Sequence, residues 1–324
     1  MRSMILPCFL SAGLIALLCG SIRPTAGAQE RTLSRYEYVE LHMGVRVRLV
    51  VYASGRAEAE KACEAAFRRF AELEDIMSDY RPHSELMRLC SRAFGNPVPV
   101  SRDLFLVLRH AQEVARRTDG AFDITVGPYV QLWRRARQGG AFPLPSELEE
   151  ARRRVGWRKV RLDPTRRTVQ LLAPGMRLDL GGIAKGYACD CALVVLRRHG
   201  IRRALVEAGG EIVVGDPPPG EPGWRIEIEN AVPGQEQVIL TNAAISTSGD
   251  TVQFLEYAGK RYSHVIDPRT GLGLTTRYLA TVIAPSGLVS DSLATAMSVL
   301  GPERGNALLR EYPGVRAWIR KVDL

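Results

Sequence analysis

The chain has 324 residues, of which 46% are hydrophobic and 24% are charged, the profile of a soluble globular protein with enough material for one large domain or two modest ones. Lys and Arg outnumber Asp and Glu by 44 to 35, which gives a formal net charge of +9. The arginines are scattered between apolar residues and no nucleic-acid-binding motif accompanies them, so we expect an anionic partner or a membrane surface and no nucleic acid.

The first 28 residues have the pattern of a secretory signal peptide. Arg2 supplies a positive charge, the apolar run MILPCFLSAGLIALLCG follows, and TAGA places Ala26 and Ala28 where a signal peptidase requires small residues. A retained N-terminal anchor stays open as an alternative. Cys19 follows the letters ALL, which leaves a lipoprotein open as well. We expect residues 1–28 to be removed and the mature protein to be periplasmic or in the cell envelope.

Hydrophobic periodicity predicts helices and strands in the first half of the chain. Alternation over 38–53 indicates one or two strands, and 55–80 has the pattern of an amphipathic helix. The apolar side of this helix is formed by Cys63, Phe67, Phe70 and Leu73. Further helices are expected over 101–120 and 146–156, and 159–175 is typical of a hairpin.

The second half of the chain continues to mix the two kinds of element. Helices are expected over 184–201 and 290–301. Strands are expected over 202–215, 224–230, 237–249, 261–267, 278–285 and 315–321. Because there is no regular βαβ period, we expect an α+β fold with mixed or antiparallel sheets and packed helices, forming one catalytic domain over 29–324.

The stretch LDLGGIAKGYACD has the composition of a phosphate-binding turn. A strand ends at Asp179, two glycines follow, and a helix begins near Lys185. Glycines allow backbone groups to approach a ligand closely, and a helix N-terminus with a lysine favours an anion. The stretch matches neither the Rossmann nor the P-loop pattern, so a structural strand-to-helix turn remains the alternative.

The stretch SDSLATAMSVLG offers ligands for a hard cation. Asp291 and Thr295 are four residues apart and therefore share one face of the expected helix. A carboxylate and a hydroxyl are oxygen ligands that suit Mg²⁺, which also takes phosphate oxygens and water. The alternative is a helix-capping Asp291 and a buried helical threonine.

Three other stretches contain residues of functional interest. In DGAFDITVGPYVQLW, Asp119 and Gly120 form a turn and Asp123 stands beside the aromatic Phe122. MSDYRPHSEL offers Tyr80, which could stack on a planar ligand if exposed. YSHVIDPRTG places His264 in an expected strand, just before a strong turn at Asp267 and Pro268. For each of these stretches an ordinary cap, turn or core position is the alternative.

Taken together, these stretches resemble one family, the ApbE-type FAD:protein FMN transferases. The matching strings are MSDYRPHSEL, DGAFDITVGP, LDLGGIAKGYACD, AGGEI, ISTSGD, HVIDPRTG and SDSLATAMSVLG, in that order, over about residues 43–301. Seven ordered matches are far more specific than any one of them. The resemblance implies an ApbE-like, T-fold-like α+β architecture and an enzyme that splits FAD with Mg²⁺, attaches FMN to a threonine or serine of a target protein, and releases AMP.

The resemblance also implies roles for particular residues. The Mg²⁺ ligands would be Asp291, Thr295 and a backbone oxygen near Gly182. The contacts to FAD would be made by Met43, Ala121, Phe122, Asp123, Asp179, Lys185 and the 264–266 segment with Ile266. Tyr80 would lie beside the adenine or the isoalloxazine ring. Glu207 and Glu211 stand where Asn and Asp are commoner in the family, and Val45 stands where Thr is usual.

His264 is then the best-placed general base toward the acceptor hydroxyl, because its unperturbed pKa near 6.5 suits proton transfer at neutral pH. The acceptor would be a flavoprotein subunit of a redox or respiratory complex, with peripheral membrane association as a further expectation. A periplasmic FAD-binding protein or a Mg²⁺-dependent FAD pyrophosphatase is the alternative function, since the same site could use water as the acceptor.

Overall fold

The fold is built on a seven-stranded sheet in which every strand pair is antiparallel. The computed structural model describes residues 32–139, 141–228, 231, 234, 236–249 and 254–322, so the expected leader lies outside the described residues. In spatial order the strands are β1 (Ser34–His42), β2 (Val45–Ala53), β6 (Ala204–Ala208), β7 (Glu211–Val214), β10 (Ala243–Ser248), β13 (Tyr278–Ala284) and β14 (Arg316–Lys321). The expected antiparallel α+β class is confirmed.

Both faces of this sheet are buried at its inner strands, which explains why those strands are rich in apolar residues. In β2, Val47 and Leu49 point into the main core, whereas Val50 points to the opposite face. In β6, Val206 points into the main core and Leu205 points to the opposite face. Successive side chains of a strand alternate between faces, so near-continuous apolar strands need cover on both sides.

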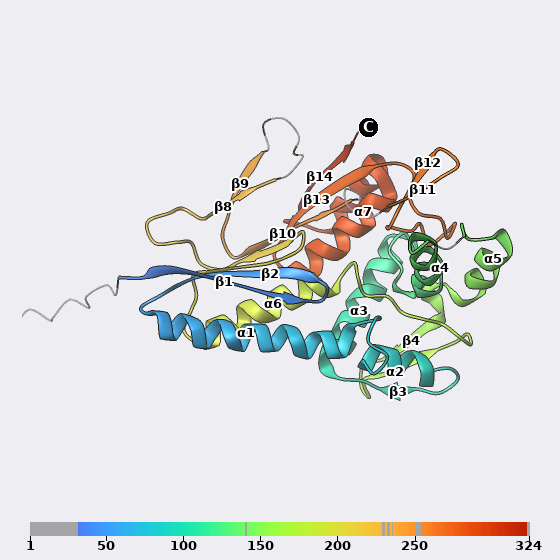
Figure 1. Cartoon of the computed structure of the whole chain (residues 1–324), viewed down its shortest axis with the longest axis horizontal. Helices are drawn as coiled ribbons and strands as arrows, with labels where there is room; N and C mark the ends of the chain where they lie inside the picture. The colour runs from blue at the N-terminus through green and yellow to red at the C-terminus, as the bar shows by residue number, and fades with distance from the viewer. Residues whose placement is uncertain are drawn as a thin grey trace, which may run out of the picture. The chain divides into compact units, whose positions relative to one another are not determined.

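Three helices cover one face of the sheet. They are α1 (Arg56–Met77), α6 (Ala184–Arg198) and α7 (Gly287–Leu308). Figure 1 shows α1 and α6 on one side of β1 and β2, with the β8–β9 ribbon on the other. The predicted apolar stripe of α1 is confirmed, because Cys63, Phe67, Phe70 and Leu73 are all buried in the main core.

The other face is covered by a two-stranded ribbon, β8 (Trp224–Glu227) with β9 (Gln237–Leu240). Trp224, Ile226 and Leu240 from this ribbon pack against Val50 and Leu205 of the sheet. A ribbon this short needs such packing for stability.

The remaining elements form a layer beside α1 and α7. They are α2 (Glu85–Arg92), α3 (Arg102–Arg117), α4 (Gly127–Arg137), α5 (Pro145–Arg154), β3 (Val98–Pro99), β4 (Val160–Asp163), β5 (Thr168–Leu171), β11 (Phe254–Tyr257), β12 (Lys260–Ser263) and short 3₁₀ turns at 124–126, 157–159 and 309–311. The hairpin expected over 159–175 is confirmed as β4 and β5. Helix α4 was not expected; it begins at Gly127 and Pro128 and buries Tyr129 and Trp133.

One end of the large sheet gathers several turns. The β1–β2 turn has Met43 and Gly44 at φ 51° and 73°, the backbone that a tight hairpin turn requires at both central positions. The β6–β7 turn lies beside it, since a Cβ at Gly209 would be 3.2 Å from the Val45 side chain. The same end carries the end of β10, because the Thr247 amide donates to the Gly210 carbonyl at 3.2 Å.

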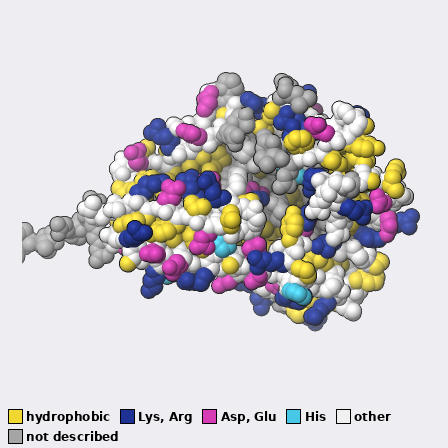
Figure 2. Space-filling view, in the orientation of Figure 1, with side chains coloured by type: hydrophobic (Ala, Val, Ile, Leu, Met, Phe, Trp, Pro, Cys, Tyr) yellow, Lys and Arg dark blue, Asp and Glu magenta, His cyan; other side chains and the backbone are white. Residues whose placement is uncertain are grey.

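The described surface carries mixed charge. Figure 2 shows Lys and Arg side chains interspersed with Asp and Glu on the face that it draws. Within the described ranges, every helix is too short or too polar to cross a bilayer. The four cysteines of the described residues, Cys63, Cys90, Cys189 and Cys191, are free thiols.

Candidate active site

The segment that precedes α6 is a braced turn. The Asp179 amide donates to the Ile124 carbonyl at 2.8 Å, and the Gly181 amide donates to Asp179 Oδ1 at 2.8 Å. The first bond ties the segment to the 121–126 loop, and the second closes a local turn on its own carboxylate. The backbone before α6 is thus fixed before any ligand arrives.

The crossing of α6 and α7 is unusually close because two glycines meet there. A Cβ at Gly186 would be 2.1 Å from the Gly287 carbonyl oxygen, a distance that no side chain could occupy. The same approach lets the Gly186 amide donate to Asp291 Oδ2 at 2.9 Å. Asp291 is therefore anchored to the N-terminal turn of α6 although 105 residues separate the two partners in sequence.

The three predicted metal-ligating positions converge at this crossing. A Cβ at Gly182 would be 2.8 Å from Thr295 Oγ1, so the backbone of Gly182 lies against the threonine hydroxyl. Asp291 lies one turn before Thr295 on α7 and is 3% exposed. Asp291 is not the helix cap, because Ser286 occupies that position.

Lys185 and Glu211 complete the charged centre. Lys185 Nζ lies 3.5 Å from Glu211 Oε1 and donates to the Gly181 carbonyl at 3.0 Å. Burial acts to lower the pKa of Lys185, but the Glu211 and Asp291 carboxylates outweigh it and hold that pKa above its ordinary value. Lys185 is thus a charged ammonium between two acids at neutral pH.

Glu211 is the acid that sequence reasoning did not place at the metal site. Burial, followed by the negative charge of Asp291, raises the pKa of Glu211 to about 8, although Lys185 opposes this shift. Its Oε2 atom is buried and has no hydrogen-bond partner among the described residues. A buried carboxylate oxygen without a partner is costly unless a proton or a cation satisfies it.

These residues fit a magnesium ion. Mg²⁺ prefers hard oxygen donors, and Asp291, Thr295 and the backbone at Gly182 supply a carboxylate, a hydroxyl and a carbonyl. The absence of a side chain at Gly182 leaves the backbone open beside Thr295. The raised pKa of Glu211 favours a proton on this carboxyl when no cation is bound, and a cation at the crossing could replace that proton and satisfy its unpartnered oxygen.

An aromatic and acidic cluster lies at the other end of the Asp179 segment. Arg134 Nη2 donates to Asp179 Oδ2 at 3.2 Å, and Arg134 also pairs with Asp79. The Arg134 guanidinium lies 3.9 Å from the centre of the Tyr80 ring. Burial and the charge of Asp79 raise the pKa of Asp179, whereas Arg134 acts to lower it. Tyr80 is 74% exposed, as its proposed stacking role requires.

The 121–123 residues lie in a braced loop, and their side chains are buried. Asp123 accepts hydrogen bonds from the Thr125 amide at 2.8 Å and hydroxyl at 2.7 Å through Oδ1, and from the Trp157 amide at 2.8 Å through Oδ2. Burial nevertheless raises its pKa. Both oxygens of Asp123 hold the loop together, so a contact of Ala121, Phe122 or Asp123 with FAD stays a prediction.

The structure corrects the local setting of His264. The expected strand 261–267 ends at Ser263, and His264 lies in a bend that follows β12. The Ser263 hydroxyl accepts from the Val265 amide at 3.0 Å, a local bond that turns the chain out of the strand. His264 is exposed, whereas Ile266 is 7% exposed and packs with Tyr129.

The turn after His264 is as rigid as the sequence indicates. Arg269 Nε and Nη2 donate to the two Asp267 oxygens, each at 2.8 Å. Trp133 Nε1 of α4 donates to the Gly271 carbonyl at 2.8 Å, which docks the whole turn on α4. The general-base role of His264 itself stays a prediction.

Two of the departures from the family pattern have structural partners. Glu207 lies directly opposite Arg48 in the β2–β6 pair and accepts from Arg48 Nε at 2.8 Å, so it serves a cross-strand ion pair. Val45 packs against Gly209 at the turns, close to Met43.

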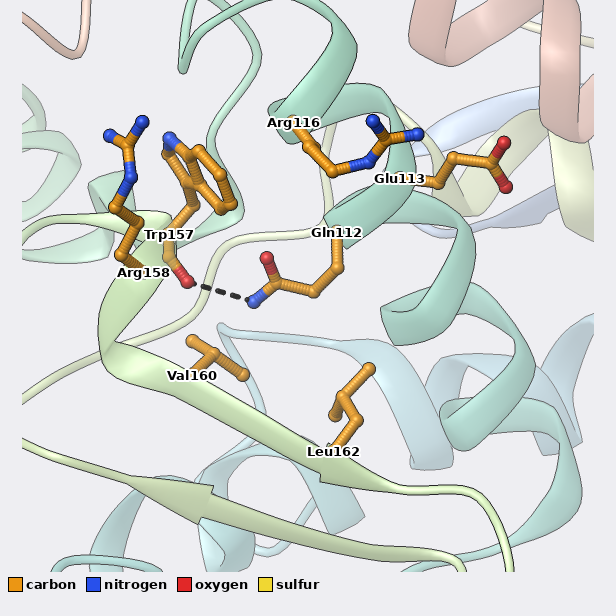
Figure 3. A pocket seen from close by; sticks show the side chains of 7 residues that line it. All are labelled: Gln112, Glu113, Arg116, Trp157, Arg158, Val160 and Leu162. Carbon is orange, nitrogen blue, oxygen red and sulfur yellow. Dashed lines mark hydrogen bonds between the residues drawn. The ribbon is translucent and has the colours of Figure 1, made fainter.

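A surface pocket of about 520 Å³ lies elsewhere, between α3 and β4 (Figure 3). It is lined by Gln112, Glu113, Arg116, Trp157, Arg158, Val160 and Leu162. None of the predicted site residues lines it. The Trp157 amide connects the pocket to them, because it donates to Asp123.

Comparison with known proteins shows which family this fold and site belong to. Two solved flavin transferases share the fold. ApbE from Pseudomonas stutzeri, in its apo form, matches with a TM-score of 0.80 and 29% sequence identity, covering 90% of this chain and 92% of that one. ApbE from Vibrio cholerae matches with a TM-score of 0.77 and 31% sequence identity, covering 89% of this chain and 93% of that one. A protein of Treponema pallidum named FAD:protein FMN transferase is 35% identical over 323 residues, 94% of this chain and 88% of the relative. The ApbE family model matches residues 43–319. The chain therefore belongs to the ApbE family.

Proposed function

We propose that the protein is a Mg²⁺-dependent FAD:protein FMN transferase. The observation that supports this most directly is the convergence of Asp291, Thr295 and Gly182 beside the half-buried ammonium of Lys185. Relatives that carry the name FAD:protein FMN transferase match this chain over most of its length. The reaction needs charge neutralisation at a pyrophosphate, which a cation and a lysine supply.

The proposed reaction is one phosphoryl transfer. A threonine or serine hydroxyl oxygen of the acceptor protein attacks the phosphorus of the FMN half of FAD. A new P–O bond forms, the bond from that phosphorus to the bridging oxygen breaks, and AMP leaves with the bridging oxygen. The hydroxyl proton passes to a base, for which His264 is the candidate, since an exposed imidazole at the edge of the fold can meet a protein acceptor.

We assign the cation to Asp291, Thr295 and the Gly182 backbone. Bound there, Mg²⁺ would neutralise phosphate charge. Lys185 would hold an anionic oxygen at the α6 N-terminus, where the backbone amides also favour negative charge. Asp179 would keep the preceding turn in place through its bond to the Gly181 amide.

We further propose that the protein acts outside the cytoplasm on a flavoprotein subunit of a redox complex. The signal-peptide pattern of residues 1–28 supports export. The net positive charge supports association with an anionic membrane surface or acceptor.

The test uses the purified protein with FAD, Mg²⁺ and a candidate acceptor domain. Mass spectrometry of the acceptor should show the added mass of FMN, and chromatography should show AMP released in equal amount. A matched acceptor with its target threonine changed to alanine should gain no mass. AMP release at the same rate without any acceptor would favour the FAD pyrophosphatase, and FAD binding without AMP release would favour a carrier.

A further inference from the structure

Arg134 on α4 is held by three partners at once. Its guanidinium pairs with Asp79, donates to Asp179 Oδ2 at 3.2 Å, and lies with its central carbon 3.9 Å from the centre of the Tyr80 ring. The two carboxylate side chains are only 10% and 11% exposed. A buried pair of acids needs a cation between them, so the contacts to Asp79 and Asp179 fix the position of the Arg134 guanidinium.

Tyr80 is fixed in turn, although it is exposed. Its amide donates to Ser78 Oγ at 3.2 Å, and the Asp79 carbonyl accepts from Arg177 Nη2 at 2.7 Å, so the backbone on its N-terminal side is tied down. Arg134 covers one side of the ring, yet the residue remains 74% exposed. The result is a flat aromatic surface with one side supported and the rest open.

We propose that Arg134 is a positioning residue that holds the Tyr80 ring as a platform for a planar ring of FAD. This inference rests on the proposed function. Both the adenine and the isoalloxazine are planar and stack on aromatic side chains by the same chemistry. The Asp179 segment joins this platform to the metal crossing, since Asp179 contacts both Arg134 and the turn before Lys185.

An arginine is required for this arrangement. A guanidinium is planar, can lie over an aromatic ring and can fork to two carboxylates, whereas an ammonium is a point charge that cannot do all three. Arg137, one turn further along α4, adds a second cation near the ring: burial and the charge of Arg134 lower its pKa, and its Nη1 is buried with no partner among the described residues.

The competing explanation is that Arg134 only neutralises Asp79 and Asp179. In that case its loss would change FAD affinity through charge alone, whether or not Tyr80 is present. In the proposed role its effect is transmitted through the ring, so it must disappear when the ring is removed. A double-mutant cycle separates the two.

The experiment measures FAD dissociation constants of the purified protein by flavin fluorescence, at fixed Mg²⁺, for the wild type, Arg134→Gln, Tyr80→Ala and the double variant. Tyr80→Ala should weaken binding about 5- to 150-fold, the range of a lost stacking contact. Arg134→Gln should weaken it about 3- to 10-fold in the wild type and less than about twofold in the Tyr80→Ala background. The matched control is Arg135→Gln, which removes a neighbouring arginine that pairs with Glu147 at the surface. This variant should bind FAD as the wild type does.

Two further arms complete the test. Arg134→Lys keeps one positive charge and should restore thermal stability while binding FAD as weakly as Arg134→Gln; it replaces Arg134→Gln in the cycle if the latter does not fold. Titration with AMP and with FMN identifies the stacked ring, because only one of the two should lose affinity in Arg134→Gln. An equal effect of Arg134→Gln with and without Tyr80 overturns the inference and leaves the transferase proposal intact, whereas a wild type that binds no FAD overturns both.

Discussion

At the scale of single residues, the site depends on contacts between distant parts of the chain. Asp291 and Thr295 could be predicted from sequence because their spacing alone places them on one face of α7. Arg134 could not, because an arginine within WRRAR gives no signal of its partner 55 residues away. Glu211 was visible only as a departure from a family pattern, and its unpartnered oxygen is a property of packing.

Asp291→Ala should abolish FMN transfer and weaken Mg²⁺-dependent FAD binding, because the cation loses its charged ligand. Thr295→Ala should be milder, since it removes one neutral ligand. Transfer rates and FAD affinities across a Mg²⁺ titration check both, with thermal midpoints to exclude unfolding of the buried site. Full transfer by Asp291→Ala at low Mg²⁺ would show that the metal lies elsewhere.

His264→Ala should slow FMN transfer by about 10²–10⁴-fold while leaving FAD affinity largely intact, since a general base acts on the acceptor and not on FAD. Its side chain is exposed, so the thermal midpoint should hardly change. Single-turnover transfer is the measurement, and His83→Ala, another exposed histidine, is the control. An unchanged rate would return His264 to a structural role.

At the scale of elements, periodicity predicted the long helices and most strands, and local chemistry overrode it elsewhere. The 3.6-residue repeat of α1 and the alternation at the start of β2 are strong because one apolar core selects them. The strand over 261–267 was predicted too long because Ser263 bonds the Val265 amide and bends the chain. Helix α4 was missed because Gly127 and Pro128 resemble a turn, although proline is common at a helix start.

The N-terminus of α7 offers a test of how the site is held. Asp190 of α6 accepts from the Gly287 amide at 2.7 Å and the Leu288 amide at 2.9 Å. Asp190→Ala should lower the free energy of unfolding by about 1–2 kcal/mol, the usual loss for a helix cap. Asp190→Asn keeps one acceptor oxygen and should lose less. Urea unfolding measures both, and wild-type stability in Asp190→Ala would contradict the capping role.

The packing of α3 on α7 should make stability depend on pH. His110 Nε2 lies 3.1 Å from Ser292 Oγ, and burial lowers the pKa of His110, with Glu113 opposing and Arg117 and Arg109 reinforcing the shift. The pKa of His110 is therefore lower in the folded protein than its value of about 6.5 in the unfolded chain. Just below that pH, the unfolded chain binds a proton that the folded protein does not bind. The contribution of His110 to stability should fall as the pH drops below about 6.5, by at most about 1.4 kcal/mol per pH unit, whereas Glu211, whose pKa is raised to about 8, contributes in the opposite direction.

Urea midpoints of the wild type and of His110→Gln between pH 8 and pH 5 measure this contribution as the difference between the two proteins. His110→Gln should remove it and His83→Gln, an exposed position, should retain it. A wild-type slope in His110→Gln would assign the acid sensitivity to other groups.

At the scale of the whole molecule, the sheet and the helices bring separate sequence motifs to a common centre. The β6–β7 turn delivers Glu211, the α6–α7 crossing delivers Lys185 and Asp291, and the Asp179 segment links this centre to Tyr80. The order of the motifs could be predicted from sequence, but the long-range contacts follow from an antiparallel sheet order, β1-β2-β6-β7-β10-β13-β14, that periodicity does not encode.

The expected signal peptide gives a further prediction, because its cleavage determines where the mature protein begins. Residues 1–28 lie outside the described residues, and the pattern TAGA places cleavage after Ala28. The exported protein should begin at about Gln29, and Edman sequencing or intact mass of protein from the cell envelope measures this. Ala28→Asp should block cleavage, because a signal peptidase site requires a small residue there. A lipid-modified terminus at Cys19 would show an anchored lipoprotein instead, and an uncleaved Met1 would show a retained anchor.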